Sequence, residues 1–314
     1  MVDYLIYGKI IIDRVRAADG SDHADLLGGG GPQGLFGARL WHDSVGFLSR
    51  SGTDIAPRFV QALAELDVDL AGWARYPALQ TFKGGLVVYD EDEYATRPDT
   101  QSPAVFQTEN WFTMLGRPLE LPAAYERPKA IHLITEFFDE PMVHTALKLK
   151  QNGVIFSLEP ILDFNTWKNR DCLLTLLPQV DLVLPDWPSA SGLAGSQEPL
   201  EVLTYWAGLG ANVVAIRNGR HGSYVWDRYS GAMWHVPIRP VQAIDPTGAG
   251  NSYGAAFCVG WTETRDARQA GCYGTLAAAQ IVQTVGMPAE VSPERRAAAT
   301  AALPELMARI EPLR

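Results

Sequence analysis

The segment AIDPTGAGNSYGAAF, residues 243–257, places Gly-Ala-Gly where a strand should give way to a helix. The Asp-Pro pair before it disfavours a helix, and Gly248 and Gly250 allow the backbone to approach a ligand closely. The helix would then begin near Asn251, with the N–H groups of Gly248, Ala249, Gly250 and Asn251 pointing at one spot. Such a turn suits a phosphate or a developing oxyanion, and otherwise is a tight turn packed with small residues.

Short apolar runs alternate with longer helical patterns along the rest of the chain. Strands are expected over 4–12, 44–49, 84–90, 130–135, 153–159, 180–185, 212–219 and 223–227. Helices are expected over 56–67, 139–151, 166–177, 199–209, 251–260, 265–285 and 292–310. This order predicts an α/β fold in which helices cover both faces of a mostly parallel sheet. The stretch GGLVVYDEDEYATRPD (84–99) departs from it and is typical of an antiparallel hairpin, which would form a lid over a ligand site.

The bulk properties limit the classes of partner. The chain has 314 residues, of which 47% are hydrophobic, enough for a sizeable core. Its formal net charge of −10 disfavours nucleic acid and membranes as partners, so an anionic ligand must be held by local groups. The three cysteines are widely spaced and indicate neither a disulfide framework nor a zinc site. With no signal-peptide pattern and no long apolar run, and with cysteines that fit a reducing setting, we expect a cytoplasmic protein.

A second glycine cluster lies in LLGGGGPQGLFGARLW (26–41). It contains G-x-G-x-x-G at Gly29, Gly31 and Gly34, with Asp54 twenty residues further on, which is the spacing of a dinucleotide-binding turn. Such a turn needs the first strand to run directly into the glycines, whereas here that strand is expected to end near residue 12. A glycine-rich substrate loop leading into a helix is the better interpretation. Motifs typical of P-loops, α/β-hydrolases and zinc proteases do not occur.

The order of these pieces carries a resemblance. YGKIIID with Asp13, GGGGPQGLFGARL, the 84–99 stretch, VDLVLPD, VVAIRNGRHGSYVWD and DPTGAGNSYGAAF follow one another as in the PfkB (ribokinase-like) carbohydrate kinase family, which the chain resembles over nearly its whole length. The resemblance implies one domain over 1–314, a three-layer α/β/α sandwich, and a β-hairpin lid contributed mainly by about 75–100. It also implies ATP- and Mg²⁺-dependent phosphorylation of a hydroxyl on a small sugar, polyol or nucleoside. We further expect a homodimer formed through the lid.

The same resemblance assigns roles to individual residues. It implies a substrate site made by Asp13, Gly28, Gly29, Gly30, Gly31 and Gln33. It implies that Gly248, Ala249 and Gly250 receive the transferred phosphoryl group. It places the nucleotide beside Asp186, Arg217, Gly219, Arg220 and Gly222, where glycines permit tight turns and arginines supply charge. Phosphoryl transfer needs mainly alignment and charge neutralisation, which such groups provide.

Three positions depart from the family's pattern. Its turn reads D-T-x-G-A-G-D, and the last Asp removes the hydroxyl proton, whereas this chain has Asn251, whose neutral amide cannot accept that proton. Its N-x-x-E corresponds here to DWPS, so Ser189 replaces the Glu and Asp186 would bind Mg²⁺ through water. Its substrate-loop Asn is replaced by Pro32 or Gln33. Loss of a general base costs about 10²–10⁴-fold in rate, which need not abolish transfer if alignment survives.

Two hypotheses from different classes therefore remain open. The first is a kinase that uses Asp245 as a substitute base or reacts with little base assistance. The second is a ligand-binding pseudokinase, or a different enzyme that reuses the anion hole. Asn251→Asp should raise kcat in a kinase that lacks only its base, and should lower activity if the Asn251 amide donates to a ligand.

Overall fold

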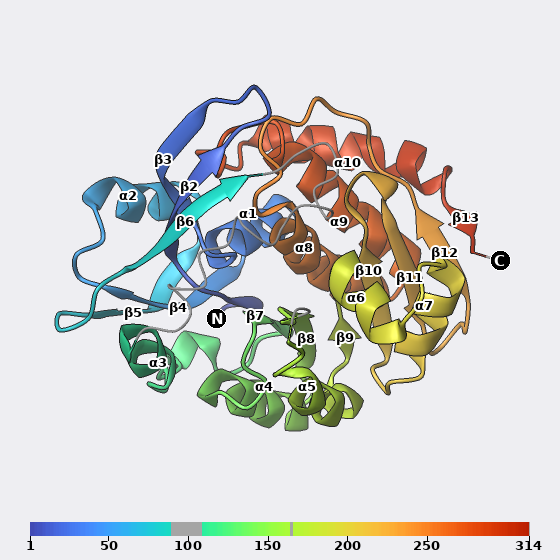
Figure 1. The fold of residues 1–314 in the computed structure, drawn as a ribbon, viewed down its shortest axis with the longest axis horizontal. Coiled ribbons are helices and arrows are strands. Elements are labelled where there is room, and N and C mark those ends of the chain that lie inside the picture. Colours follow the sequence, from blue (N-terminus) through green and yellow to red (C-terminus); the bar gives the residue numbers. More distant parts are fainter. Residues whose placement is uncertain (89–108, 164–165, 314) are drawn as a thin grey trace.

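The computed structural model describes residues 1–88, 109–163 and 166–313. A ten-stranded sheet runs through the molecule, parallel from β10 to β5 and antiparallel from β10 to β13 (Figure 1). In spatial order its strands are β13 (Glu311–Pro312), β12 (Met233–Val236), β11 (Ser223–Asp227), β10 (Val213–Arg217), β9 (Leu182–Val183), β8 (Ile155–Pro160), β7 (Ala130–Thr135), β1 (Tyr4–Tyr7), β4 (Val45–Gly52) and β5 (Asp69–Tyr76).

Helices cover both faces of this sheet, as Figure 1 shows. One face carries α1 (Gly31–Trp41), α2 (Pro57–Glu65), α8 (Ala249–Thr264), α9 (Ala267–Ile281) and α10 (Pro293–Met307). The opposite face carries α4 (Pro141–Gln151), α5 (Arg170–Leu176), α6 (Trp187–Ala194) and α7 (Pro199–Ala207). The expected three-layer α/β/α sandwich with a mostly parallel sheet is confirmed.

Burial on both faces explains the composition of the central strands. Every residue of β1, β7, β8 and β10 is buried, and all four strands are largely continuous apolar runs rather than alternating ones. Such runs are typical of a parallel sheet that helices cover on both sides. The exceptions include His132, Ser157, Glu159 and Arg217, which are polar and buried, and three of these lie at or next to the functional cavity described below.

A second, three-stranded sheet stands beside the main one, in the order β3 (Asp22–Gly28), β2 (Ile11–Arg16), β6 (Phe82–Val88). The prediction of a single strand over 4–12 was wrong, because the chain leaves β1 after residue 7 and enters β2 at residue 11. Residues 4–12 are all buried, so no change in polarity marks the break. A Cβ on Gly8 would lie 2.6 Å from the Cα of Gly31, so only glycine fits where the chain turns.

The small sheet also differs in origin from the expected lid. Two of its strands come from 11–28, including the segment expected to be a polar connection, whereas the prediction assigned the lid mainly to about 75–100. β6 pairs in parallel with β2, and most of the hairpin expected over 84–99 lies outside the described residues. Helix α3 (Glu109–Leu115) packs Trp111 and Met114 beneath this sheet, against Ile11 and Phe82. Among the helices of the described ranges, none is long and apolar enough to cross a membrane.

Candidate active site at the converging ends of α1 and α8

The first turns of α1 and α8 meet at one place because glycines let the two helices pack closely. A Cβ on Gly37 would lie 2.1 Å from the carbonyl oxygen of Ser252, so the backbones of the two helices are in direct contact. One turn earlier, Gly34 faces Ala255. The N-terminal ends of both helices, each carrying unsatisfied N–H groups and a positive partial charge, therefore face the same space.

The loops before these helices also contact each other. Gly248, at φ 80°, brings its Cα so close to Gln33 that a Cβ there would lie 2.1 Å from Gln33 Cγ. Gly30, at φ 86°, lies against the amide of Asn251, with 3.1 Å from the Cβ position to Nδ2. The two glycine loops are more than two hundred residues apart in the sequence, and the fold places them side by side.

Gln33 has a structural use for its amide. Its Oε1 accepts a hydrogen bond from Gly30 N–H (3.1 Å), and its Nε2 donates to the carbonyl of Leu27 (3.1 Å). The side chain is 2% exposed, so both groups are engaged inside the protein. Gln33 therefore holds the glycine-rich loop in shape at the cavity wall.

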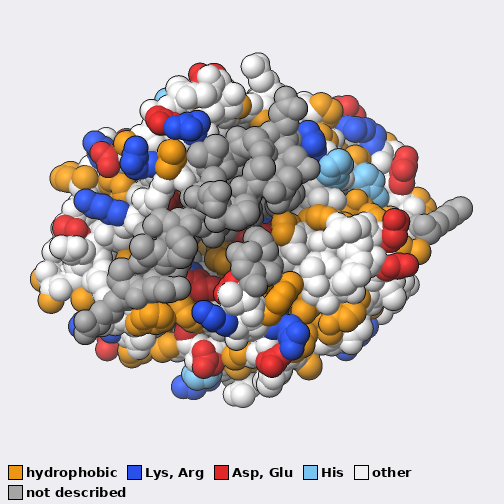
Figure 2. Space-filling model, viewed as in Figure 1, with side chains coloured by type: hydrophobic (Ala, Val, Ile, Leu, Met, Phe, Trp, Pro, Cys, Tyr) orange, Lys and Arg blue, Asp and Glu red, His pale blue; other side chains and the backbone are white. Residues whose placement is uncertain are grey.

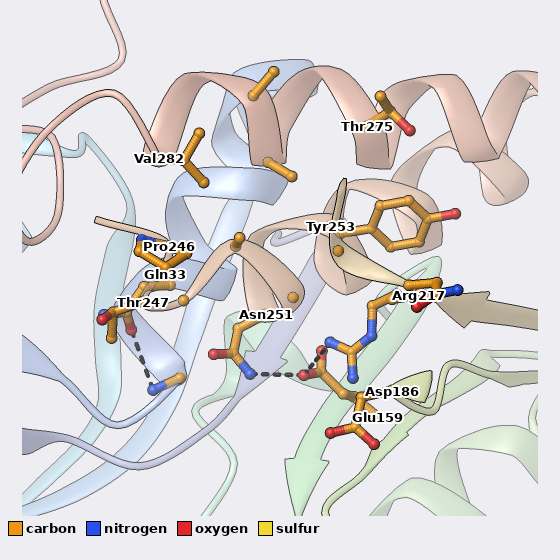
Figure 3. Close-up of a pocket in the computed structure, with 18 of the residues that line it drawn as sticks. Gln33, Glu159, Asp186, Arg217, Pro246, Thr247, Asn251, Tyr253, Thr275 and Val282 are labelled. Atoms are coloured by element: carbon orange, nitrogen blue, oxygen red, sulfur yellow. Dashed lines mark hydrogen bonds and ion pairs between the residues drawn. The ribbon is translucent and has the colours of Figure 1, made fainter. Parts of the chain in front are cut away.

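A cavity of about 830 Å³ opens between these loops and the β10–β11 turn (Figure 3). It is lined by most of the site residues expected from the sequence: Gly29, Gly30, Gln33, Asp186, Arg217, Gly219, Arg220, Gly222, Gly248, Ala249, Gly250 and Asn251. Figure 2 shows acidic and basic side chains interspersed over the described part of this face. Selectivity for an anion must therefore come from the groups of the cavity itself.

The anion-hole turn offers fewer free donors than the sequence predicted. Ala249 N–H donates to the carbonyl of Pro246 (3.1 Å). The first helical hydrogen bond of α8 runs from Ser252 N–H to the carbonyl of Gly248 (2.9 Å). Within the described chain, the N–H groups of Gly250 and Asn251 have no backbone acceptor and remain available to a ligand.

Glu159, at the end of β8, is the buried charge at the centre of the site. It is 2% exposed, and its Oε1 accepts from Asn251 Nδ2 (2.6 Å) and from Arg217 Nη1 (2.6 Å) (Figure 3). Burial alone would raise its pKa, but the charge of Arg217 and the neighbouring His132 outweigh burial and hold the pKa below the ordinary value. Glu159 was not among the site residues expected from the sequence; its one signal was a carboxylate inside a largely apolar strand.

Arg217 places a positive charge directly behind the anion hole. A Cβ on Gly250 would lie 2.5 Å from Arg217 Nη1, so the guanidinium lies against the first turn of α8. Arg220, in the turn between β10 and β11, lines the same cavity, and Gly219 and Gly222 shape that turn at φ 48° and 85°. These cations would complement the charge of a phosphate group at the helix end.

Four expected site residues do not line the cavity: Asp13, Gly28, Gly31 and Asp245. Asp245 is 1% exposed, and its oxygens accept from the N–H groups of Thr247 (2.9 Å) and Gly286 (2.8 Å). That geometry makes Asp245 a brace for the turn and gives no support to its use as a substitute base. Gly31 N–H donates to the carbonyl of Lys9 (3.1 Å), which ties the start of α1 to the chain entering β2.

Asp13 lies in β2, and its carboxylate contacts a glycine of each neighbouring strand. A side chain at Gly28 in β3 or at Gly84 in β6 would collide with it. Burial raises the pKa of Asp13 to about 7, and the charge of Asp245 adds to that rise against a hydrogen bond from Gly29 N–H. The folded protein thus binds this proton more tightly than the unfolded chain, whose carboxyl titrates near 3.8. The contribution of Asp13 to stability is therefore full below about pH 4 and is lost as the pH rises to about 7.

We expect Asp13→Asn to flatten part of the stability profile. Between pH 5 and pH 8 the wild type should lose at least about 1 kcal/mol more unfolding free energy than the variant, because only the wild type must ionise a buried carboxyl. Urea denaturation at both pH values measures this difference. Parallel pH profiles for the two proteins would contradict it.

The donors around Asp186 decide how a divalent cation could be held. Asp186 caps α6, with its Oδ1 accepting from Ser189 N–H (3.0 Å), and it lines the cavity. Nowhere in the described ranges do three or more His, Cys, Asp or Glu side chains gather as a metal site. These residues fit a hard cation held chiefly by phosphate oxygens and water, with Asp186 as a nearby carboxylate.

Known proteins are similar to this chain in sequence and in fold. A cytidine kinase of Thermococcus kodakarensis is 24% identical over 290 residues, covering 91% of this chain and 98% of that protein. The adenosine kinase structure from Sinorhizobium meliloti superposes with a TM-score of 0.76 at 17% identity, covering 96% of this chain and 99% of its own. A putative ribokinase II from E. coli, solved with ATP and Mg²⁺, gives 0.70 at 18% identity, with 96% and 99% coverage. The model of the pfkB family of carbohydrate kinases matches residues 3–294, and the chain belongs to that family.

Proposed function

We propose that this protein transfers the γ-phosphoryl group of ATP to a hydroxyl of a small sugar, polyol or nucleoside. The observation that carries the proposal is the meeting of two glycine loops and two helix N-termini at one cavity, with Arg217 behind the anion hole. Relatives named as kinases of cytidine, adenosine and carbohydrates support this substrate range. The three-stranded sheet would act as the lid of a single ribokinase-like domain.

In this proposal the acceptor hydroxyl lies in the cavity, beside Gly30 and the side chain of Asn251. The γ-phosphate lies against the N–H groups of Gly250 and Asn251, and Arg217 and Arg220 offset its charge. The bond between the acceptor oxygen and phosphorus forms as the bond to ADP breaks, and the hydroxyl proton leaves to a phosphoryl oxygen and then to solvent. Mg²⁺ would supply further charge neutralisation beside Asp186.

The single test of this proposal is nucleotide binding followed by turnover. We expect calorimetry to show binding of ATP and ADP in the presence of Mg²⁺ and none of NAD, because the glycines at 29–34 serve the start of α1 rather than a dinucleotide. A panel of sugars, polyols and nucleosides should then contain an acceptor that raises Tm and releases ADP from Mg-ATP. Tight NAD binding without ATP binding would overturn the kinase assignment.

One observation favours a second candidate, a ligand-binding pseudokinase or an enzyme of different chemistry. The side chain at 251 is an amide whose N–H is occupied by Glu159, so no ionised group at that position is ready to take a proton. An acceptor that raises Tm in the presence of Mg-ATP but gives no phosphorylated product would identify this case.

A further inference from the structure

We infer that Glu159 positions the acceptor hydroxyl by fixing the orientation of the Asn251 amide, an inference that rests on the proposed phosphotransferase function. A carboxylate can only accept, so the group of Asn251 that meets Glu159 Oε1 at 2.6 Å must be the Nδ2 donor. The carbonyl Oδ1 is then turned to the opposite side, away from Glu159, as Figure 3 shows. Oδ1 thereby becomes an acceptor of fixed direction at the cavity wall.

The position of Oδ1 suits a hydroxyl of the substrate. Asn251 lines the cavity at the first turn of α8, and Gly30 lies against its amide. A hydroxyl that donates its hydrogen to Oδ1 would point an oxygen lone pair along the cavity toward the anion hole. Because a misplaced nucleophile loses much of the advantage of orientation, an acceptor held in one direction contributes to rate without removing the proton.

Glu159 itself is placed to hold Asn251 rather than to act as the base. Both lone pairs of Oε1 are engaged, by Asn251 and by Arg217 at 2.6 Å each. Oε2 faces α8, where a Cβ on Gly254 would lie 2.4 Å away, and His132 Nε2 stands 3.5 Å from it. The lowered pKa of Glu159 also makes it a weak proton acceptor. The carboxylate thus acts through Asn251 as a positioning residue.

This arrangement changes what Asn251→Asp should do. The substitution would place a second carboxylate against Glu159 at the present contact, and two touching carboxylates cannot both ionise without strong repulsion. At low pH the pair would share one proton and imitate the amide–carboxylate contact. As the pH rises through its raised pKa, the shared proton is lost and the contact breaks.

The decisive experiment compares the wild type with Glu159→Leu, Glu159→Gln, Asn251→Asp and the double exchange of Glu159→Gln with Asn251→Asp. In the double exchange, the amide nitrogen introduced at position 159 can donate to the carboxylate introduced at position 251, so that contact and the net charge are restored, while Arg217 loses the acceptor that it now shares with Asn251. We measure kcat and KM from pH 5.5 to 8.5 with the acceptor found in the panel, ADP affinity by calorimetry, and Tm. Glu140→Gln is the control, a buried carboxylate that accepts from Tyr7 (2.6 Å) outside the cavity lining.

We expect Glu159→Leu, which removes the acceptor, to lower kcat at least tenfold while ADP affinity changes less than threefold, and Glu159→Gln, whose amide oxygen can still accept from Asn251, to lose less. Asn251→Asp should be most active at low pH and lose activity as the pH rises, and the double exchange should keep more of its kcat at high pH than Asn251→Asp does. Glu140→Gln should lower Tm and leave kcat unchanged.

An active wild type with Glu159→Leu unchanged in kcat, or with losses that simply add in the double exchange, would overturn the inference alone. A wild type without ADP binding or turnover would overturn the proposed function, and the inference with it.

Discussion

Gly37→Val is expected to separate α1 from α8 and to remove most activity. The added Cβ would fall 2.1 Å from the carbonyl oxygen of Ser252, which is backbone inside a buried helix and cannot move aside alone. Overpacking of this kind costs about 1–3 kcal/mol, and we expect the upper end of that range because two further methyl groups follow the Cβ. Both helix N-termini would shift, so the two glycine loops would no longer meet.

Urea denaturation and turnover with Mg-ATP measure the two consequences. Ala297→Val, on an exposed position of α10, is the matched control for the helix propensity of valine, which costs only about 0.5–0.7 kcal/mol. Gly37→Ala should fall between the two, because its single methyl group meets the same oxygen but favours the helix. If Gly37→Val were as stable and as active as Ala297→Val, close packing of α1 on α8 would not be what assembles the site.

Gly248→Ala should have the largest effect on nucleotide use. Gly248 has φ 80° and its Cβ position lies 2.1 Å from Gln33 Cγ, so alanine meets both backbone strain and a buried side chain. The turn can relax only by moving the anion hole or by displacing Gln33 from the loop it braces. We expect ADP affinity to fall at least tenfold and kcat/KM at least about a hundredfold, the scale seen when a developing charge loses its aligned donors.

Gly231→Ala separates strain from contact in this test. Gly231 has φ 66°, comparable to Gly248, but nothing lies within 4 Å of its Cβ position. Gly231→Ala should lower the free energy of unfolding by only roughly 1–2 kcal/mol, the cost of a left-handed backbone for alanine, and should keep its nucleotide affinity. Equal effects of the two substitutions on ADP binding would show that the approach to Gln33 is unimportant.

The contact between Asn251 and Glu159 alters the meaning of the substitution at 251. From the sequence, Asn251→Asp is the return of a missing base, with a gain in kcat as one outcome. The structure shows that the Asn251 amide is already the donor in a buried contact, 2.6 Å from a carboxylate. The effect of a substitution at 251 therefore depends on Glu159 as well. Asn251→Asp alone changes this contact and cannot by itself show what a catalytic base would add.

The layers of the fold and the two glycine loops at the cavity could be predicted from the sequence alone. Continuous apolar strands separated by helical patterns predict a covered parallel sheet, because period and polarity are local properties of the chain. The turn at 248–251 and the cluster at 28–31 were recognisable for the same reason, since a helix start after glycines needs no distant partner. The loop leading into α1 was also expected, although its length and bounds were not.

Which residues meet at the site followed from tertiary packing. The strand expected over 4–12 hides two strands in different sheets, since burial on every side removes the alternation that would reveal the break. Asp245 lies in the expected motif, yet its carboxylate is held by backbone N–H groups, one of them 41 residues away at Gly286. Glu159 and Asn251 stand 92 residues apart, and their contact follows from the register of β8 beside the start of α8. Such contacts depend on where whole elements pack, which no local pattern records.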